Sequence, residues 1–228
     1  MFRELRQWGL THTELKILAM ISMLLDHLGF AFCPYGSVGY VILRGAGRLA
    51  FPIYCYLVTE GYVHTRDWKR YLMDLLIFGL ISEVPFDLVA GGTWFYPQGQ
   101  NVMFTLAFGL LGIAAGEQFR MQGKENLRWL VYVGVCLAGW LLQSDYGMEG
   151  VALILAFWLG RGTKERWLWP GIVILAMGGL EIFALTALPL LSLYHGEKGA
   201  GGPKYLFYGF YPAHLLLIGL TAMALRGM

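Results

Sequence analysis

The stretch VGYVILRGAGRLAFPIYCYLVTEGYV (residues 38–63) decides the fold class. It is longer than the roughly 20 residues that a helix needs to cross the hydrocarbon core of a bilayer, and its only charged residues are Arg44, Arg48 and Glu60. Apolar runs of this kind recur along the chain, which is 57% hydrophobic and only 14% charged. Soluble domains carry roughly 25% charged residues. We therefore expect an all-α integral membrane protein, with residues 1–228 forming a single polytopic domain.

About eight segments have the length and apolar character of transmembrane helices. The first carries Asp26 and His27 and has no small-residue cleavage site after it, so we expect a permanent span rather than a signal peptide. The seventh is long enough to hold two shorter helices, broken near Gly178, Gly179 and Glu181. The predicted spans cover residues 14–33, 38–63, 69–90, 102–118, 127–142, 148–159, 167–193 and 205–225.

Basic residues mark one side of the predicted membrane. They gather in every second connection, whereas the other connections hold only Lys198 and Lys204. Lys and Arg concentrate in cytoplasmic loops, so this alternation predicts that both termini are cytoplasmic. The basic residues assigned to that side are Arg3, Arg6, Arg66, Lys69, Arg70, Arg120, Lys124, Arg128, Arg161, Lys164, Arg166 and Arg226.

Charged residues also gather in the outer half of the predicted spans. Arg44 and Arg48 are four residues apart and share one helix face, as do Glu83 and Asp87, with Pro85 between them. An unpaired charge near the bilayer centre costs at least ~3 kcal/mol, so the cluster would cost on the order of 10 kcal/mol unless its members pair or reach water. We expect an ionic cluster, with Arg44 paired to Glu83 or Asp87. Its predicted members are Asp26, His27, Arg44, Arg48, Glu83, Asp87, Asn101, Asp145 and Glu149, whereas Glu60, Glu181 and His214 fall elsewhere.

His27 is the only histidine of this predicted cluster. A histidine surrounded by acids can act as a general base near pH 7. No second His or Cys stands at ligand spacing, and the three cysteines show no metal pattern, so no metal site is expected. The alternatives are a satisfied core histidine and, for the arginines and acids, structural ion pairs that fix helix register.

Several stretches resemble the TraX family of bacterial membrane proteins. The likeness covers nearly the whole chain and is most specific in the first four predicted spans, whereas residues 161–204 contribute none of it. The matching stretches are LKILAM (15–20) with Met23, DHLG (26–29), RGAGRLAFP (44–52), Glu60 with Gly61, ISEVPFDL (81–88), NVMFTL (101–106), DYG (145–147) with Gly150, and YPAHL (211–215).

The resemblance implies an acyl-transfer function in the bacterial inner membrane. The named member of the family is tied to N-terminal acetylation of a conjugative pilin. The family also looks related to transmembrane acyltransferases that take acyl groups from cytosolic acyl-CoA and use an early-span histidine as general base. By this resemblance His27 would be the base, in a catalytic set with Asp26, Glu83 and Asp87. Candidates for binding acetyl-CoA or the acceptor are Arg44, Arg48, Glu60, Asn101, Asp145, Tyr146 and His214.

Individual roles follow from the same resemblance. Arg44 and Arg48 would stabilise the oxyanion or hold CoA phosphates, and Asn101 would donate to the acyl oxygen. Glu83 and Asp87 would orient the imidazole ring or the ammonium of the acceptor.

The expected function is transfer of an acetyl group from acetyl-CoA, with no metal cofactor, to an acceptor at the extracytoplasmic side. That acceptor is a peptide such as a pilin N-terminus, a glycan or a small amine. The net charge of +2 is too small to indicate nucleic acid as a partner. Two alternatives remain: a small transporter or proton-coupled channel that uses the buried charges, and a non-catalytic membrane assembly factor. The oligomeric state stays open, although Gly45 with Gly47 and Gly109 with Gly112 allow close helix contacts.

Overall fold

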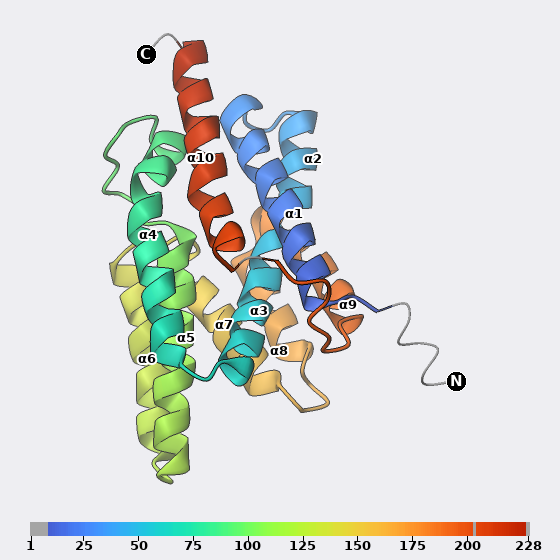
Figure 1. The fold of residues 1–228 in the computed structure, drawn as a ribbon, viewed down its shortest axis with the longest axis vertical. Coiled ribbons are helices and arrows are strands. Elements are labelled where there is room, and N and C mark those ends of the chain that lie inside the picture. The colour runs from blue at the N-terminus through green and yellow to red at the C-terminus, as the bar shows by residue number, and fades with distance from the viewer. Residues whose placement is uncertain (1–8, 203, 227–228) are drawn as a thin grey trace.

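The computed structural model describes residues 9–202 and 204–226, and this part of the chain is built from helices, without β-strands (Figure 1). The expected all-α architecture is confirmed. The helices are α1 (His12–Phe32), α2 (Val38–Gly47), α3 (Ala50–His64), α4 (Trp68–Ala90), α5 (Val102–Met121), α6 (Glu125–Leu141), α7 (Gly147–Gly160), α8 (Leu168–Met177), the 3-10 helix η2 (Gly179–Thr186), α9 (Ala187–Ser192) and α10 (Lys204–Arg226).

The described helices have the character of a membrane protein. Large apolar side chains are exposed on the outside of the bundle, such as Leu80 at 68% and Leu217 at 68%. Exposed apolar surface on this scale is rare on soluble monomers and suits contact with lipid. Four segments are long and apolar enough to cross a membrane: His12–Phe32, Val38–His64, Val102–Met121 and Tyr205–Leu225.

Helices α3, α5 and α7 form the centre of the bundle. Their side chains Ile53, Leu110 and Ile154 are fully buried. Gly109 of α5 packs directly on Ile154, and Gly112 packs on α6, so a Cβ at either position would clash. These two glycines therefore serve helix packing within the chain.

The predicted span 38–63 is bent into two helices. Pro52 lies in the first turn of α3, the part of a helix where its missing N–H group is tolerated. The preceding helix α2 ends at Gly47. Arg48 stands at the bend, and its side chain is only 6% exposed. The bend thus carries a charged group into the interior.

Residues 168–192 fold back on themselves as a helical hairpin. The chain breaks at Gly178, where φ is +69°, a conformation that favours glycine. Trp167 before α8 and Tyr194 after α9 both pack against Tyr56 of α3, with ring centroids 6.0 and 5.8 Å from it. The predicted break is confirmed. The reading of this stretch as one crossing is wrong, because it enters and leaves at the same end of the bundle.

Helix α10 runs in the same direction as α1. The Lys16 ammonium lies 4.8 Å from the centroid of the Phe207 ring, and eleven residues further along α1, His27 meets His214. The start of α1 and the end of α10 therefore lie at opposite ends of the bundle (Figure 1). The prediction that both termini share one side is not confirmed. The apolar stretch that was predicted as the seventh span is a hairpin. The helix after it, α10, therefore runs in the opposite direction to the one predicted.

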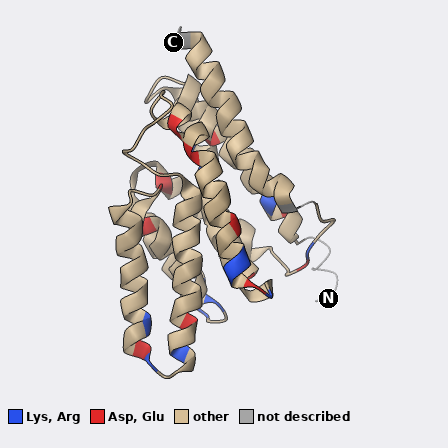
Figure 2. Ribbon diagram, turned by 60° about the vertical axis from the view of Figure 1, so that its left-hand side comes forward, with Lys and Arg blue, Asp and Glu red and all other residues tan. Residues whose placement is uncertain are grey.

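Most basic residues lie at one end of the molecule, which we call the basic end (Figure 2). It contains the start of α1 and the α3–α4, α5–α6 and α7–α8 connections. The segment 195–202 also belongs to it, because Thr13 donates to the Lys198 carbonyl at 2.8 Å. Lys198 thus joins the side with most of the other cations. Arg3 and Arg6 lie outside the described residues. We call the other end, with the α1–α2, α4–α5 and α6–α7 connections, the opposite end.

Candidate functional site

Two histidines from distant parts of the sequence meet between α1 and α10. Nδ1 of His27 lies 3.0 Å from Nε2 of His214, and their ring centroids are 5.0 Å apart. His214 is 5% exposed and stacks on Phe210. His27 therefore has a histidine beside it, which corrects the prediction that it stands alone. The two residues are 187 positions apart, so no local pattern could have paired them.

The neighbours of the two rings determine which nitrogens carry protons. His214 Nδ1 lies 2.8 Å from the Phe210 carbonyl, which can only accept, so Nδ1 is the donor and Nε2 is left as an acceptor. His27 Nδ1 then faces two acceptors, this Nε2 and the Met23 carbonyl at 2.9 Å. It must therefore carry the proton. Nε2 of His27 is left with a free lone pair, the form that a general base requires.

Asp26 joins Arg44 of α2 and Arg48 at the bend after α2. One carboxylate oxygen accepts from Arg44, and the other accepts from Arg48 through Nη2 and, at 3.2 Å, through Nε. Arg48 also pairs with Glu181 at the apex of the hairpin. All four side chains are at most 19% exposed. In such surroundings each charge depends on its partner, because an unpaired buried charge is strongly unfavourable.

The observed ion pairs differ from the predicted ones. Arg44 binds Asp26 and not Glu83 or Asp87, because α2 packs against α1 and the hairpin. Glu181 was placed elsewhere from the sequence and turns out to be a member. Its signal was its position beside the Gly178 break in an otherwise apolar run.

Glu83, Asp87 and Asn101 belong to a separate hydrogen-bonded group. The Asn101 side-chain amide donates to Glu83 and, at 2.8 Å, to the Gly79 carbonyl, while its oxygen caps α5 by accepting from Met103 N at 3.0 Å. Asp87 accepts from the Tyr96 amide at 3.0 Å. The two acids thus hold the α4–α5 connection. Because both amide hydrogens of Asn101 are used, its predicted role as donor to an acyl oxygen has no support in this geometry.

The α6–α7 turn closes the site at the opposite end. Tyr146 has φ of +64°, which is strained for a side chain of this size, and its ring stacks on Phe51 at 3.7 Å between centroids. The Arg48 guanidinium lies 5.8 Å from the centroid of the Tyr146 ring. Thr105 donates to the Asp145 carbonyl. Burial raises the pKa of the Asp145 carboxyl to about 6, although Arg48 acts to lower it.

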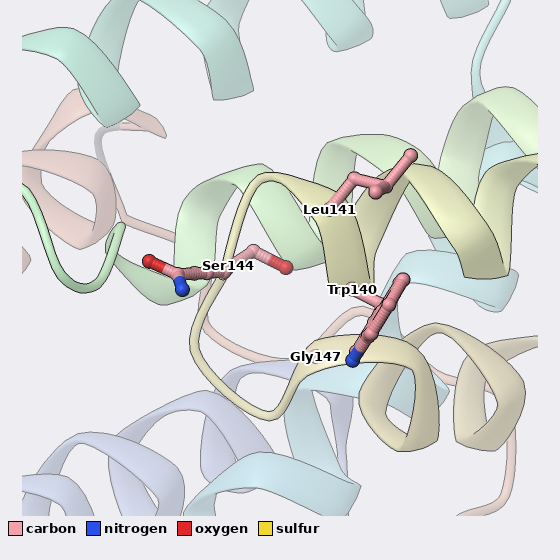
Figure 3. Close-up of a pocket in the computed structure, with 5 residues that line it drawn as sticks. Trp140, Leu141, Ser144 and Gly147 are labelled. Atoms are coloured by element: carbon pink, nitrogen blue, oxygen red, sulfur yellow. The ribbon is translucent and has the colours of Figure 1, made fainter.

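A shallow hollow of about 440 Å³ lies beside this turn (Figure 3). Trp140 and Leu141, which line it, are 59% and 69% exposed. Its other lining residues, Gln143, Ser144 and Gly147, carry no charge. The hollow therefore suits contact with lipid better than chemistry.

Glu60 lies away from the histidine pair, at the basic end. Its carboxylate accepts from Arg161 at 3.2 Å and lies 3.5 Å from Nε2 of His64. It forms part of the wall of a cavity of about 930 Å³. Among the described residues no group of His, Cys, Asp and Glu is placed to hold a metal ion.

Known proteins are similar to this chain over nearly its whole length. The family described as TraX protein covers residues 11–222. The protein named "Probable fimbrial assembly protein FimC, serogroup H1" from Dichelobacter nodosus is 30% identical over 239 residues, which cover 93% of this chain and 96% of the relative. No solved structure matches. By the length of the family match, which includes both histidines and the arginine cluster, the chain belongs to the TraX family.

Proposed function

We propose that the chain is a multi-pass acyltransferase of the bacterial inner membrane, which moves an acyl group, such as acetyl, from acyl-CoA to an amine or hydroxyl. The observation that carries this proposal is the hydrogen-bond geometry around His27. Its Nδ1 lies 2.9 Å from the Met23 carbonyl and 3.0 Å from Nε2 of His214, and in the neutral ring this arrangement leaves the His27 Nε2 lone pair to act as a base.

The residues divide the reaction among them. His27 Nε2 takes the proton from the acceptor nitrogen or oxygen as that atom bonds to the thioester carbonyl carbon. The same proton is then given to the departing CoA sulfur, so the products are the acylated acceptor and CoA thiol. Arg44 supplies a donor for the oxyanion, because its Nε is buried and makes no hydrogen bond within the described chain. Asp26 and Glu181 hold the arginines in place.

The proposed orientation places the basic end in the cytoplasm, because Lys and Arg concentrate there. The histidine pair and the α6–α7 turn then lie toward the outside. With α10 parallel to α1, the end of α10 is extracytoplasmic in this orientation. Alkaline phosphatase fused after residue 228 should be active, since it folds only outside the cytoplasm; a cytoplasmic reporter active at the same position would contradict this orientation.

The acceptor that we propose is the N-terminus of a pilin-type subunit. The relative from Dichelobacter nodosus is named as a fimbrial assembly protein, and the match covers 96% of its length. An extracytoplasmic pilin terminus would meet the site at the proposed outer face. A primary amine also fits the base, because its ammonium form must lose a proton before the nitrogen lone pair can attack, and the attacking nitrogen loses a further proton as the amide forms.

Labelled acetyl-CoA tests the activity directly. Membranes that contain the protein should acetylate a small set of proteins, which mass spectrometry identifies. Substitution His27→Ala should lower the rate by about 10²- to 10⁴-fold. The matched control is Ile21→Ala, on the exposed side of the same helix, which should keep the wild-type rate. An unchanged rate in His27→Ala would exclude this residue as the base.

A non-catalytic assembly factor is the second candidate. It is favoured by the complete pairing of Arg48 with Asp26 and Glu181, which a purely structural clamp would also show. The substitution His27→Ala distinguishes the two, because it leaves the ion cluster intact. A non-catalytic assembly factor should keep pilus assembly in this variant, whereas an acyltransferase should lose acyl transfer even where the protein still folds.

A further inference from the structure

The cavity at the basic end lies apart from the histidine pair and has a different composition. Its volume of about 930 Å³ is in the range of small-molecule sites. It opens between the starts of α1, α4 and α10 and the end of α3. Four cations line it, Lys16, Arg66, Arg70 and Lys198.

Cations outnumber the available acids in this cavity. Its two carboxylates are Glu60 and Asp67. Glu60 is paired with Arg161, and Asp67 caps α4 by accepting from the Arg70 amide at 3.0 Å. The excess positive charge therefore suits an anionic ligand.

One wall of the cavity is the glycine-rich stretch GEKGAGG (residues 196–202). Gly196 and Gly201 have φ of +85° and +71°, and a Cβ at either position would meet open space. The stretch is tied to the start of α1 through two carbonyls, Glu197 accepting from His12 N and Lys198 from Thr13 Oγ1, both at 2.8 Å. Among the described residues, the amides of this stretch donate no backbone–backbone hydrogen bond. Glycine-rich backbone with free N–H groups next to a lysine is a common way of holding phosphate.

The inner part of the cavity is aromatic and apolar. Tyr54, Tyr71, Tyr205 and Tyr208 line it, together with leucines and Met103. Aromatic rings give stacking surfaces for a nucleobase, and the apolar inner walls suit an extended uncharged part of the ligand. A phospholipid headgroup has phosphate but no ring to stack, so the lining favours a nucleotide.

We propose that this cavity binds the phosphorylated nucleotide end of the acyl donor, with phosphates at Arg66, Arg70, Lys198 and the 196–202 stretch. The proposal rests on the proposed function only in naming the ligand as the donor. The reacting end then has to reach His27. Lys16 and His27 are eleven residues apart on α1, which is about 16 Å of helix. The ligand therefore needs an extended arm of that length between its phosphates and its acyl group.

Binding is tested without turnover, on the full chain in nanodiscs, with labelled CoA that carries no acyl group. Arg70→Gln and Lys198→Gln should each weaken binding by about 5- to 10-fold, since each removes one charge-assisted contact. The strained position Gly201→Ala should weaken it as well. The matched control is Lys69→Gln, because Lys69 neighbours Arg70 but does not line the cavity.

The outcomes separate this inference from the proposed function. Binding that is kept in His27→Ala and weakened in Lys198→Gln supports the cavity, even where no acceptor is ever acylated. CoA binding that is absent, or equally strong in Lys69→Gln and Lys198→Gln, overturns the inference, even where acyl transfer is observed. Vesicles of anionic phospholipid that displace CoA completely while adenosine 3′,5′-bisphosphate does not would show a lipid headgroup site and overturn it too.

Discussion

The two polar regions of the molecule are built in different ways. Around Asp26 the charged groups are buried and bind one another, and the helices that carry them are held by packing. In the cavity at the basic end the cations Arg66, Arg70 and Lys198 are exposed and line open space, and one wall is loop. The first arrangement fixes side chains in position, as chemistry requires, whereas the second leaves charge available for a ligand.

The largest expected effect is a loss of stability when the ion cluster around Asp26 is disrupted. Arg48→Ala leaves Asp26 and Glu181 without their shared partner, so stability should fall by about 3–5 kcal/mol. Thermal unfolding in detergent measures the loss. Lys69→Ala, on the exposed start of α4, is the control and should stay within about 0.5 kcal/mol of the wild type. Equal stability of the two variants would mean that the ion cluster is solvated.

A smaller effect is expected where the close approach of α1 and α2 is disturbed. A Cβ at Gly47 would clash with Asp26, so Gly47→Ala should destabilise by about 1–3 kcal/mol through overpacking. Gly134→Ala on α6, where a Cβ would meet nothing within 4 Å, is the matched control and should be neutral or stabilising. Unfolding curves of both variants check the difference.

His214 should affect chemistry more than stability. Without it His27 Nδ1 keeps only the Met23 carbonyl, so the tautomer is less firmly set. We expect His214→Ala to lower acyl transfer about 10-fold with a changed pH profile, and His214→Gln to restore part of the rate, because its amide oxygen can also accept. A uniform loss without change in the pH profile would assign His214 a packing role only.

Capping at the basic end should matter least to the fold as a whole. Thr11 and Glu14 form a capping box at the start of α1, and Thr11→Ala should cost about 1 kcal/mol. Denaturant unfolding gives the value. In contrast, Lys198→Gln should leave stability unchanged while it weakens CoA binding, which separates a structural residue from a ligand-binding residue in the same region.

The sequence predicts well where the helices lie along the chain, and poorly how they are arranged in space. The runs 14–33, 69–90, 102–118, 127–142, 148–159 and 205–225 each became one helix, because apolar length and flanking polar residues decide where a helix can lie. Apolar length alone could not show that the stretch around Gly178 folds back, because two short helices and one long span can have the same apolar content. That single difference reversed the direction of α10.

The candidate site shows the same limit. Asp26, His27, Arg44 and Arg48 were predicted to lie together, and they lie on the packed helices α1 and α2 and on the bend that follows α2. Their partners Glu181 and His214 come from far along the chain, and only the packing of the hairpin and α10 brings them in. The cavity was missed because its residues are spread over the starts and ends of several helices. The glycine-rich stretch 196–202 was its one visible signal.

One paired measurement on His27→Ala tests the division between the two regions most directly. Labelled CoA binding and acetyl transfer are measured on the same purified protein. The proposed division predicts that His27→Ala binds CoA as tightly as the wild type and transfers acetyl at least about 100-fold more slowly. Transfer at the wild-type rate by His27→Ala, with binding intact, would contradict the assignment of the histidine pair as the site of chemistry.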